Sequence, residues 1–385
     1  MWLPYRVTQL LPTRSRLRKA WYQSPLFHGQ CELKRRFATA TSAKVSSSHE
    51  IGSPTVTLVR VIGNDLYPRH RQGQALNNLQ TILRDEDTPP GWSKLFVLNR
   101  LIDPEETQRA VAAILQAGHH VEVIPFDLAT YQALRYQPQI FGGLDYFSSA
   151  TFAGEDAFVQ DRMRIWACGE KIRYLMNING ARNVALTCGL TSTDWTFVLD
   201  GSCIVPDAAF AALRHDLSRH PGARYLIIPM RRLSLGVDLS EADCSPSFRE
   251  EPQIGFRFDA VEQFDPVYPY GVRDKTSLLH RLGVPGPWCT WAPLPWHLES
   301  SHRSVDRYCF EYASASVLRL TSGVDNGELE HSSAQMKRYR SRITAIFSTL
   351  MEMDRRCSAS DASILPAIAG FSLEADVLTA GADQR

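Results

Sequence analysis

The sequence predicts an α/β fold in which helices flank a mixed, mostly parallel sheet. From residue 55 onward, short runs of β-branched and apolar residues alternate with amphipathic segments. This alternation is typical of parallel strands that are joined by helices. The chain has 385 residues, of which 44% are apolar and 22% charged, so it is long enough to bury a sizeable core.

The predicted elements follow one another in β-α-β order. Strands are expected at 55–62, 94–99, 121–125, 195–200 and from Tyr225, and helices at about 70–86, 104–118, 166–190, 206–219 and 330–354. Asp103 and Pro104 mark one helix start, because Asp caps free amides and Pro suits the first helical position. Residues 127–165 form an aromatic-rich excursion, and 231–300 are rich in Pro, Gly and aromatic residues.

The most informative motif lies at residues 177–203. Asn179, Arg182 and Asn183 stand at i, i+3 and i+4 of a predicted helix and therefore share one polar face. The strand that follows ends in one carboxylate, Asp200. Ligands of α/β sheets bind outside the carboxyl ends of the strands, so we expect Asp200 at a ligand site.

This order resembles the middle of an inverting GT-A-fold glycosyltransferase close to family 2, where a similar helix precedes a strand that ends in D-x-D. Upstream, the first strand runs into Asn64 and the second leads to Asp103, similar to the opening strands of that family. The likeness covers about residues 55–230. It departs from the family at Ser202, where the second acid of D-x-D is expected.

The resemblance implies a GT-A-like, Rossmann-related domain. In this interpretation 1–54 are a basic leader and linker, and 55–230 are the nucleotide-sugar-binding half. An irregular acceptor-side region and a C-terminal helix occupy 231–354, and 355–385 are a loosely ordered tail. The implied activity is transfer of a sugar, with inversion, from a nucleotide-diphosphate donor to an acceptor that the sequence does not identify.

Several polar residues are candidates for binding the donor. They are Asn64, Asp103, Asn179, Arg182, Asn183 and Asp200. Asp200 is also the candidate ligand of Mg²⁺ or Mn²⁺, which bind carboxylates together with substrate phosphates, although Asp before Gly is also an ordinary turn residue. Arg182 either contacts phosphate or pairs with Asp200, and Asp103 either contacts the donor or only caps a helix.

The general base of the family is an Asp downstream of D-x-D. Asp265, Asp274 and Glu251 are the candidates here, each in a loop bounded by Pro, where a carboxylate is held still. A single acid in such a region is more often a solvated surface residue. The same region contains Trp288, Trp291 and Trp296, which offer flat surfaces for sugar rings.

Two rival functions predict different geometry. A non-catalytic nucleotide-sugar-binding or scaffold protein predicts a cleft filled by 127–165, whereas an enzyme predicts a cleft shared by Asp200, Arg182, Asp103 and a downstream carboxylate. A nucleotidyltransferase predicts a basic loop after the first strand, of which Arg69-His70-Arg71 is a short version.

Charge is distributed unevenly along the chain. The first 44 residues carry nine Lys and Arg against one acid, Glu32, and the rest carry 33 basic and 40 acidic residues. The leader and its Arg35-Arg36-Phe37-Ala38 segment resemble a mitochondrial transit peptide, and a basic tail in a cytoplasmic protein is the alternative. The acidic remainder argues against nucleic-acid binding, and no run reaches the ~18 apolar residues that span a bilayer.

Overall fold

The computed structural model describes residues 54–233, 238–271, 275–286, 288, 304–320, 331–357 and 364–370. The basic leader, Asp274, Trp291 and Trp296 lie outside these residues, so the predictions made for them stay predictions. The described strands are β1 (Val56–Ile62), β2 (Trp92–Asn99), β3 (His120–Ile124), β4 (Trp195–Asp200), β5 (Cys203–Ile204), β6 (Tyr225–Ile228), β7 (Met230–Arg232), β8 (Gln253–Arg257), β9 (Phe310–Tyr312) and β10 (Val317–Arg319). The described helices are α4 (Gln74–Asp85), α5 (Pro104–Gln116), α6 (Leu128–Ala133), η1 (Pro138–Phe141), η2 (Leu144–Ser148), α7 (Ala150–Ala153), α8 (Ala157–Ala167), α9 (Gly169–Met176), α10 (Ile178–Leu190), α11 (Asp207–Arg219), η3 (Leu239–Glu241), α12 (Thr276–Leu282), α13 (His331–Arg356) and α14 (Ile364–Ala369).

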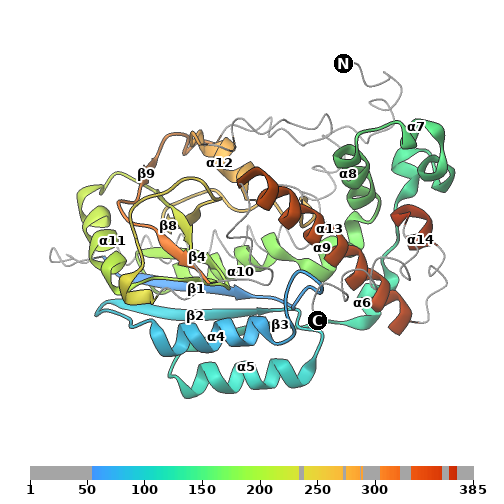
Figure 1. Cartoon of the computed structure of the whole chain (residues 1–385). Helices are drawn as coiled ribbons and strands as arrows, with labels where there is room; N and C mark the ends of the chain where they lie inside the picture. The colour runs from blue at the N-terminus through green and yellow to red at the C-terminus, as the bar shows by residue number, and fades with distance from the viewer. Residues whose placement is uncertain are drawn as a thin grey trace.

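The main sheet confirms the predicted fold class. In the described part of the chain its strand order is β3-β2-β1-β4-β8-β6-β9. β1 pairs in parallel with both β2 and β4, whereas β8 runs antiparallel to β4 and β6. Because β2 and β3 extend from one side of β1 and β4 from the other, the direction of strand order reverses between β1 and β4 (Figure 1).

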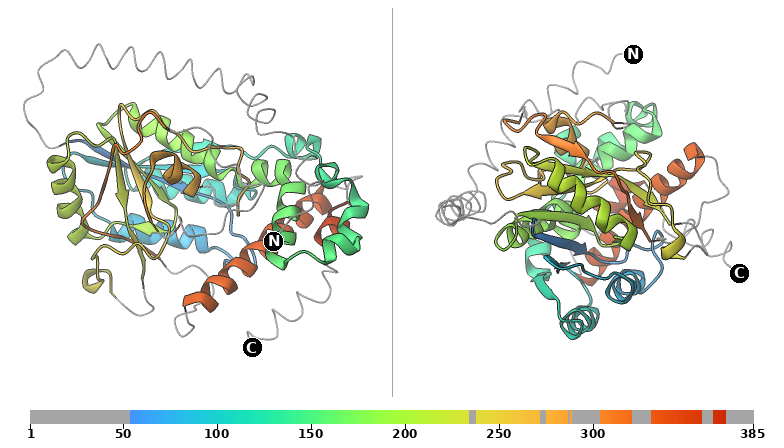
Figure 2. Two further views of the ribbon diagram at one scale, coloured as in Figure 1. Left: turned by 90° about the horizontal axis from the view of Figure 1, so that it is seen from above. Right: turned by 90° about the vertical axis from the view of Figure 1, so that its left-hand side faces the viewer.

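Helices cover both faces of this sheet. α4 and α5 pack on one face, with Leu79 and Ile114 in the same cluster as the β2 residue Phe96. α10 and α12 pack on the other, with Ala185 and Leu278 in one cluster with strand residues (Figure 2). All seven residues of β1 are buried, as expected of a strand that is covered on both sides.

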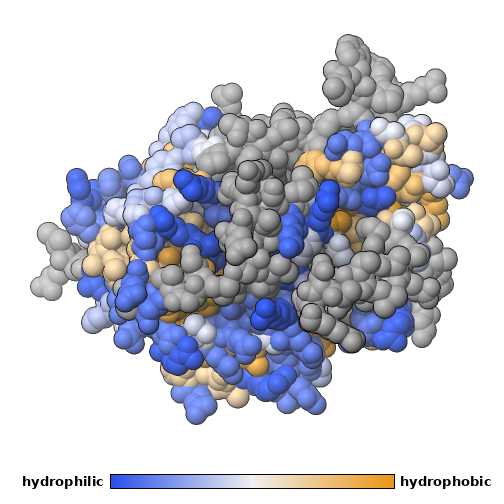
Figure 3. Space-filling model, viewed as in Figure 1, coloured by the Kyte–Doolittle hydropathy of each residue, from blue (hydrophilic) through white to orange (hydrophobic). Residues whose placement is uncertain are grey.

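The aromatic-rich excursion packs with later helices into a separate helical layer. We call this layer the cap; it consists of α6–α9, η1, η2, α13 and α14. The cap lies to the right of the sheet in Figure 1 and has its own hydrophobic cluster, which includes Tyr131, Phe347 and Leu365. In the space-filling view, hydrophobic residues gather over its short helices, whereas the surface over α4 and α5 is mostly hydrophilic (Figure 3). α14 lies inside the range 355–385, where we expected a loosely ordered tail.

The helix predicted for 166–190 is wrong as a single element. The chain forms α8, α9 and α10 instead, and the second break falls at Asn177, whose φ of 39° is left-handed. Asn adopts this conformation more readily than most residues, and its side chain donates to Oδ1 of Asn99 at 3.0 Å. A Cβ at Gly180 would lie 2.1 Å from Oδ1 of Asn177, so glycine makes room for the break.

No helix in the described part of the chain combines the length and the apolar character that crossing a membrane requires.

Candidate functional site

A pocket opens where the order of the parallel strands reverses. Its lining includes Asn64 after β1, Asn99 at the end of β2, and Asp200 and Ser202 at the end of β4. Its volume is about 200 Å³, and one water needs roughly 10–15 Å³, so a small organic ligand fits. The location is the one at which ligands bind in open α/β sheets.

The turn after β4 depends on close approach to β1. A Cβ on Gly201 would lie 2.5 Å from the backbone oxygen of Val61, so a residue with a side chain would force the two strands apart. Ser202 accepts a backbone hydrogen bond from Leu320 at 2.8 Å. The glycine therefore keeps the side chains of β1 and β4 at one edge of the pocket.

The carboxylate of Asp200 is paired with cations and is 22% exposed. Arg182 donates to Oδ1 at 3.0 Å, and Nζ of Lys275 lies 3.3 Å from Oδ2. Gln253 also donates to Oδ2, at 3.2 Å. Burial raises the pKa of Asp200, but Lys275, Arg182 and Arg319 more than offset it and hold the pKa well below its usual range.

These residues do not fit a divalent cation. Both oxygens of Asp200 already accept hydrogen bonds, and the positive charges around it oppose a further dication. Among the residues that the structure describes, no group of three or more His, Cys, Asp or Glu side chains is arranged to hold a metal ion. The arrangement suits an anion better than Mg²⁺ or Mn²⁺.

The polar face of α10 is divided between two tasks. Of its three polar residues only Arg182 lines the pocket. Asn183 and Phe264 exchange hydrogen bonds, Asn183 donating to the Phe264 carbonyl at 2.9 Å and accepting from its N–H at 3.0 Å. Asn179 donates to the carbonyl of Asp265 at 2.8 Å and accepts from Arg182 at 3.0 Å. The two asparagines therefore hold the chain at 264–265 and orient Arg182.

The polar residues at the ends of β1 and β2 are tied to neighbouring backbone. Asn64 lines the pocket, donates to the Arg100 carbonyl at 2.8 Å and accepts from the Ile102 N–H at 2.8 Å. Asp103 is exposed, does not line the pocket and caps α5 by accepting from Glu105 at 2.9 Å. For Asp103 the structure shows the cap that was one of its two interpretations.

The candidate bases fall in different places. Glu251 lines the pocket. Asp265 does not line it, and its carboxylate accepts from the N–H of Val267 at 3.0 Å, closing a local turn. Trp288, expected to offer a flat surface for sugars, is instead core: it is 1% exposed and donates to the Val284 carbonyl at 2.9 Å.

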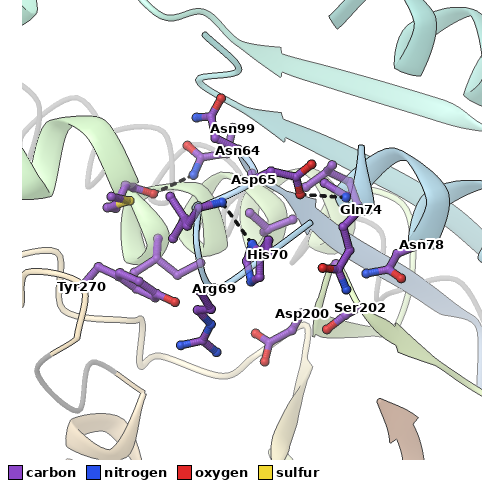
Figure 4. A pocket seen from close by; sticks show the side chains of 18 of the residues that line it. Asn64, Asp65, Arg69, His70, Gln74, Asn78, Asn99, Asp200, Ser202 and Tyr270 are labelled. Carbon is purple, nitrogen blue, oxygen red and sulfur yellow. Dashed lines mark hydrogen bonds between the residues drawn. The ribbon is translucent and has the colours of Figure 1, made fainter. Parts of the chain in front are cut away.

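Two residues of the loop between β1 and α4 belong to the site, although they were not among the predicted donor-binding residues. Arg69 and His70 both line the pocket, where Figure 4 shows them with Asp200 and Tyr270. Nδ1 of His70 accepts from the Leu66 N–H at 3.2 Å, and burial with repulsion from Arg69 lowers its pKa to about 3. The ring is therefore neutral and carries its proton on Nε2 as a donor. The basic Arg69-His70-Arg71 segment after the first strand was the available signal.

Comparison with known proteins leaves the function to be inferred from this site. No family model matches the chain, and no curated protein matches it. It is similar to a mannosyltransferase from Pyrobaculum calidifontis in complex with GDP-mannose and Mn²⁺, at 11% identity and a TM-score of 0.36 over 93% of this chain and 89% of that one. It is also similar to a cytidylyltransferase from Leptospira borgpetersenii, at 12% identity and a TM-score of 0.25 over 71% and 82% of the two chains. Likenesses this weak carry no weight for activity.

Proposed function

We propose that the protein is a glycosyltransferase that binds a nucleotide-diphosphate sugar in the pocket between the ends of β1 and β4. The observation that carries the proposal is the pocket itself. It lies at the reversal of strand order and combines amide side chains at the strand ends with Arg182 and Asp200. The Asn64 amide keeps one donor and one lone pair beyond its backbone contacts, which suits a nucleoside, and the planar guanidinium of Arg182 suits phosphate oxygens.

The chemistry that we propose is a single displacement with inversion. The oxygen of an acceptor hydroxyl attacks the anomeric carbon, the bond from this carbon to the diphosphate oxygen breaks, and the electron pair leaves with the diphosphate. The hydroxyl proton goes to Glu251, the candidate base that lines the pocket in the described part of the chain. Arg182 stabilises the charge that develops on the leaving diphosphate.

Ligand binding followed by thermal melting tests this function. We expect UDP, GDP or CDP, or one of their sugar conjugates, to raise the melting temperature, whereas the matching nucleoside does not. At a hundredfold excess over Kd the stabilisation is about 2.7 kcal/mol. Glu251→Gln is expected to keep donor binding and to lower transfer at least ~100-fold. If no nucleotide in this panel raises the melting temperature, the proposal is wrong.

A nucleotidyltransferase is the second candidate. One observation favours it: Arg69 and His70, in the loop after the first strand, line the pocket, as a triphosphate-binding loop would. The products separate the two functions. A nucleotidyltransferase releases pyrophosphate from a nucleoside triphosphate, and a glycosyltransferase releases a nucleoside diphosphate from a sugar nucleotide. The scaffold alternative has less support, because none of residues 127–165 lines the pocket.

A further inference from the structure

We propose that a cluster of arginines compensates the diphosphate charge in this pocket, so that the ligand binds without a divalent metal ion. The inference rests on the proposed function and names how the same site holds its anion. We call Arg69, Arg182, Arg319 and Arg342 the guanidinium cluster; all four line the pocket.

The cluster is assembled from four distant parts of the chain. Arg69 lies in the loop between β1 and α4 and Arg182 lies on α10, whereas Arg319 ends β10 and Arg342 belongs to α13. The members are close enough to repel one another. Burial, together with Arg342, Arg319 and Arg232, lowers the pKa of Arg69 to about 9, against the opposing influence of Tyr270. Like charges held so close that they lower one another's pKa are typical of functional sites.

Arg69 is the member with the least compensation. Its side chain belongs to a residue that is only 8% exposed, and its Nη1 is buried without a hydrogen-bond acceptor in the described part of the chain. The Nε atoms of Arg319 and Arg342 are buried without an acceptor there as well. A buried donor that lacks an acceptor destabilises the folded protein, and an anion in the pocket would relieve that cost.

The acids in and beside the pocket cancel only part of this charge: Asp200 and Glu250 raise the pKa of Arg319 against the effect of its burial. Asp200 is shared between Arg182 and Lys275, so one carboxylate faces two cations. Asp65 accepts from the Ala75 N–H at 2.9 Å in the first turn of α4, and burial raises its pKa. The lining thus holds four arginines and three carboxylates, the third being Glu251, and Lys275 adds a cation beside them. A surplus of positive charge favours a diphosphate and disfavours a dication.

The neutral His70 adds a hydrogen-bond donor without adding charge. Since its Nδ1 accepts from Leu66, its Nε2–H is the free donor of the ring. Figure 4 shows His70 and Arg69 on the same loop within the pocket, so the loop presents one neutral and one charged donor. The four arginines and His70 thus offer charged and neutral N–H donors, which are the groups that bind an anion through side chains alone.

Isothermal titration of the full chain with inorganic pyrophosphate, UDP and GDP in EDTA tests this inference. We expect binding in EDTA, and a loss of affinity of at least tenfold for Arg69→Met and for Arg342→Met. Arg69→Lys keeps the charge, loses the planar fork and is expected to fall between Arg69→Met and the parent protein. Arg71→Met is the matched control, because Arg71 is exposed and does not line the pocket; its affinity is expected to stay within twofold.

Ser202→Asp distinguishes the guanidinium cluster from a metal site, because the two predict opposite changes in nucleotide affinity. It places a further negative charge in the pocket, so in EDTA we expect at least tenfold weaker binding of UDP and GDP. Any one of three results shows that the guanidinium cluster is not the anion site, while the proposed function stands. These results are a requirement of binding for Mn²⁺, tighter binding by Ser202→Asp in the presence of Mn²⁺, and an unchanged affinity of Arg69→Met. Absence of binding by all three probes, with and without Mn²⁺, overturns both.

Discussion

Two carboxylates, Asp354 in the cap and Asp200 in the pocket, are each paired with cations, and their surroundings differ. Asp354 accepts from Lys171 at 2.8 Å, from the Tyr131 hydroxyl at 3.0 Å and from the Tyr136 hydroxyl. Lys171 lies over both tyrosine rings, 4.8 and 4.6 Å from their centroids. One cation, one carboxylate and two neutral donors close this network within the hydrophobic cluster of the cap.

The Asp200 site has the opposite balance. Its carboxylate meets Arg182 and Lys275, and further arginines line the same open pocket. In the cap, by contrast, burial and Asp354 raise the pKa of Tyr131, so its hydroxyl remains a hydrogen-bond donor to Asp354. The charges and donors of the cap network are therefore balanced without a ligand. A closed, balanced ion pair is thus part of the core, whereas an open site with surplus charge indicates a ligand of the opposite sign.

The largest effect is expected when the closed network is broken. Asp354→Ala leaves Lys171, which is 1% exposed, as an unpaired buried cation. We expect the free energy of unfolding to fall by about 3–5 kcal/mol, measured by urea denaturation. The double change Lys171→Met with Asp354→Leu removes both charges and is expected to recover most of that loss. A loss below about 1 kcal/mol for Asp354→Ala would show that the cap does not depend on this pair.

Removing an arginine from the pocket is expected to stabilise the ligand-free protein, whereas breaking the cap network destabilises it. Arg69→Met takes away a buried, under-compensated cation, so we expect the free energy of unfolding of the ligand-free protein to rise by about 1 kcal/mol. The same variant is the one expected to lose diphosphate affinity. Arg71→Met, at an exposed position, is the control and should leave stability unchanged. A destabilised Arg69→Met would indicate that Arg69 is a structural residue, and the contrast between the two sites would fail.

The last effect concerns pH. The folded pKa of His70 is about 3, below its ordinary 6.5, so the unfolded chain binds a proton first as pH falls. The contribution of His70 to stability is therefore complete above pH 6.5 and declines as pH falls from 6.5 towards 3. Asn at this position accepts from Leu66 without titrating. We expect the melting temperature of His70→Asn to fall less between pH 7.5 and 5 than that of the parent protein; parallel curves would contradict a depressed pKa.

The local elements of the fold were largely predictable from the sequence. Strands β1 and β4 and helix α5 lie where their apolar periodicity and the Asp103-Pro104 start predict them, because these signals arise within each segment. The break between α9 and α10 was missed, because it depends on one residue, Asn177, whose left-handed conformation fits its contact with Asn99.

The site, too, has features that were predictable from the sequence and features that were not. The sequence by itself determined that Asp200 ends a buried strand and that Arg182 shares a helix face with Asn179 and Asn183, since both properties follow from the local repeat. It also placed Arg69 after the first strand. Only the tertiary structure decided that Asn179 and Asn183 bind the chain at 264–265.

Tertiary structure alone also decided which charges meet in the pocket. Lys275 lies 75 residues from Asp200 in the sequence, and Arg319 and Arg342 come from still later elements. Periodicity and spacing describe neighbours along one helix or strand, whereas these side chains are brought together by strand order and helix packing. The physical reason is that a pairwise electrostatic interaction depends on distance in space, which no local pattern of residues specifies.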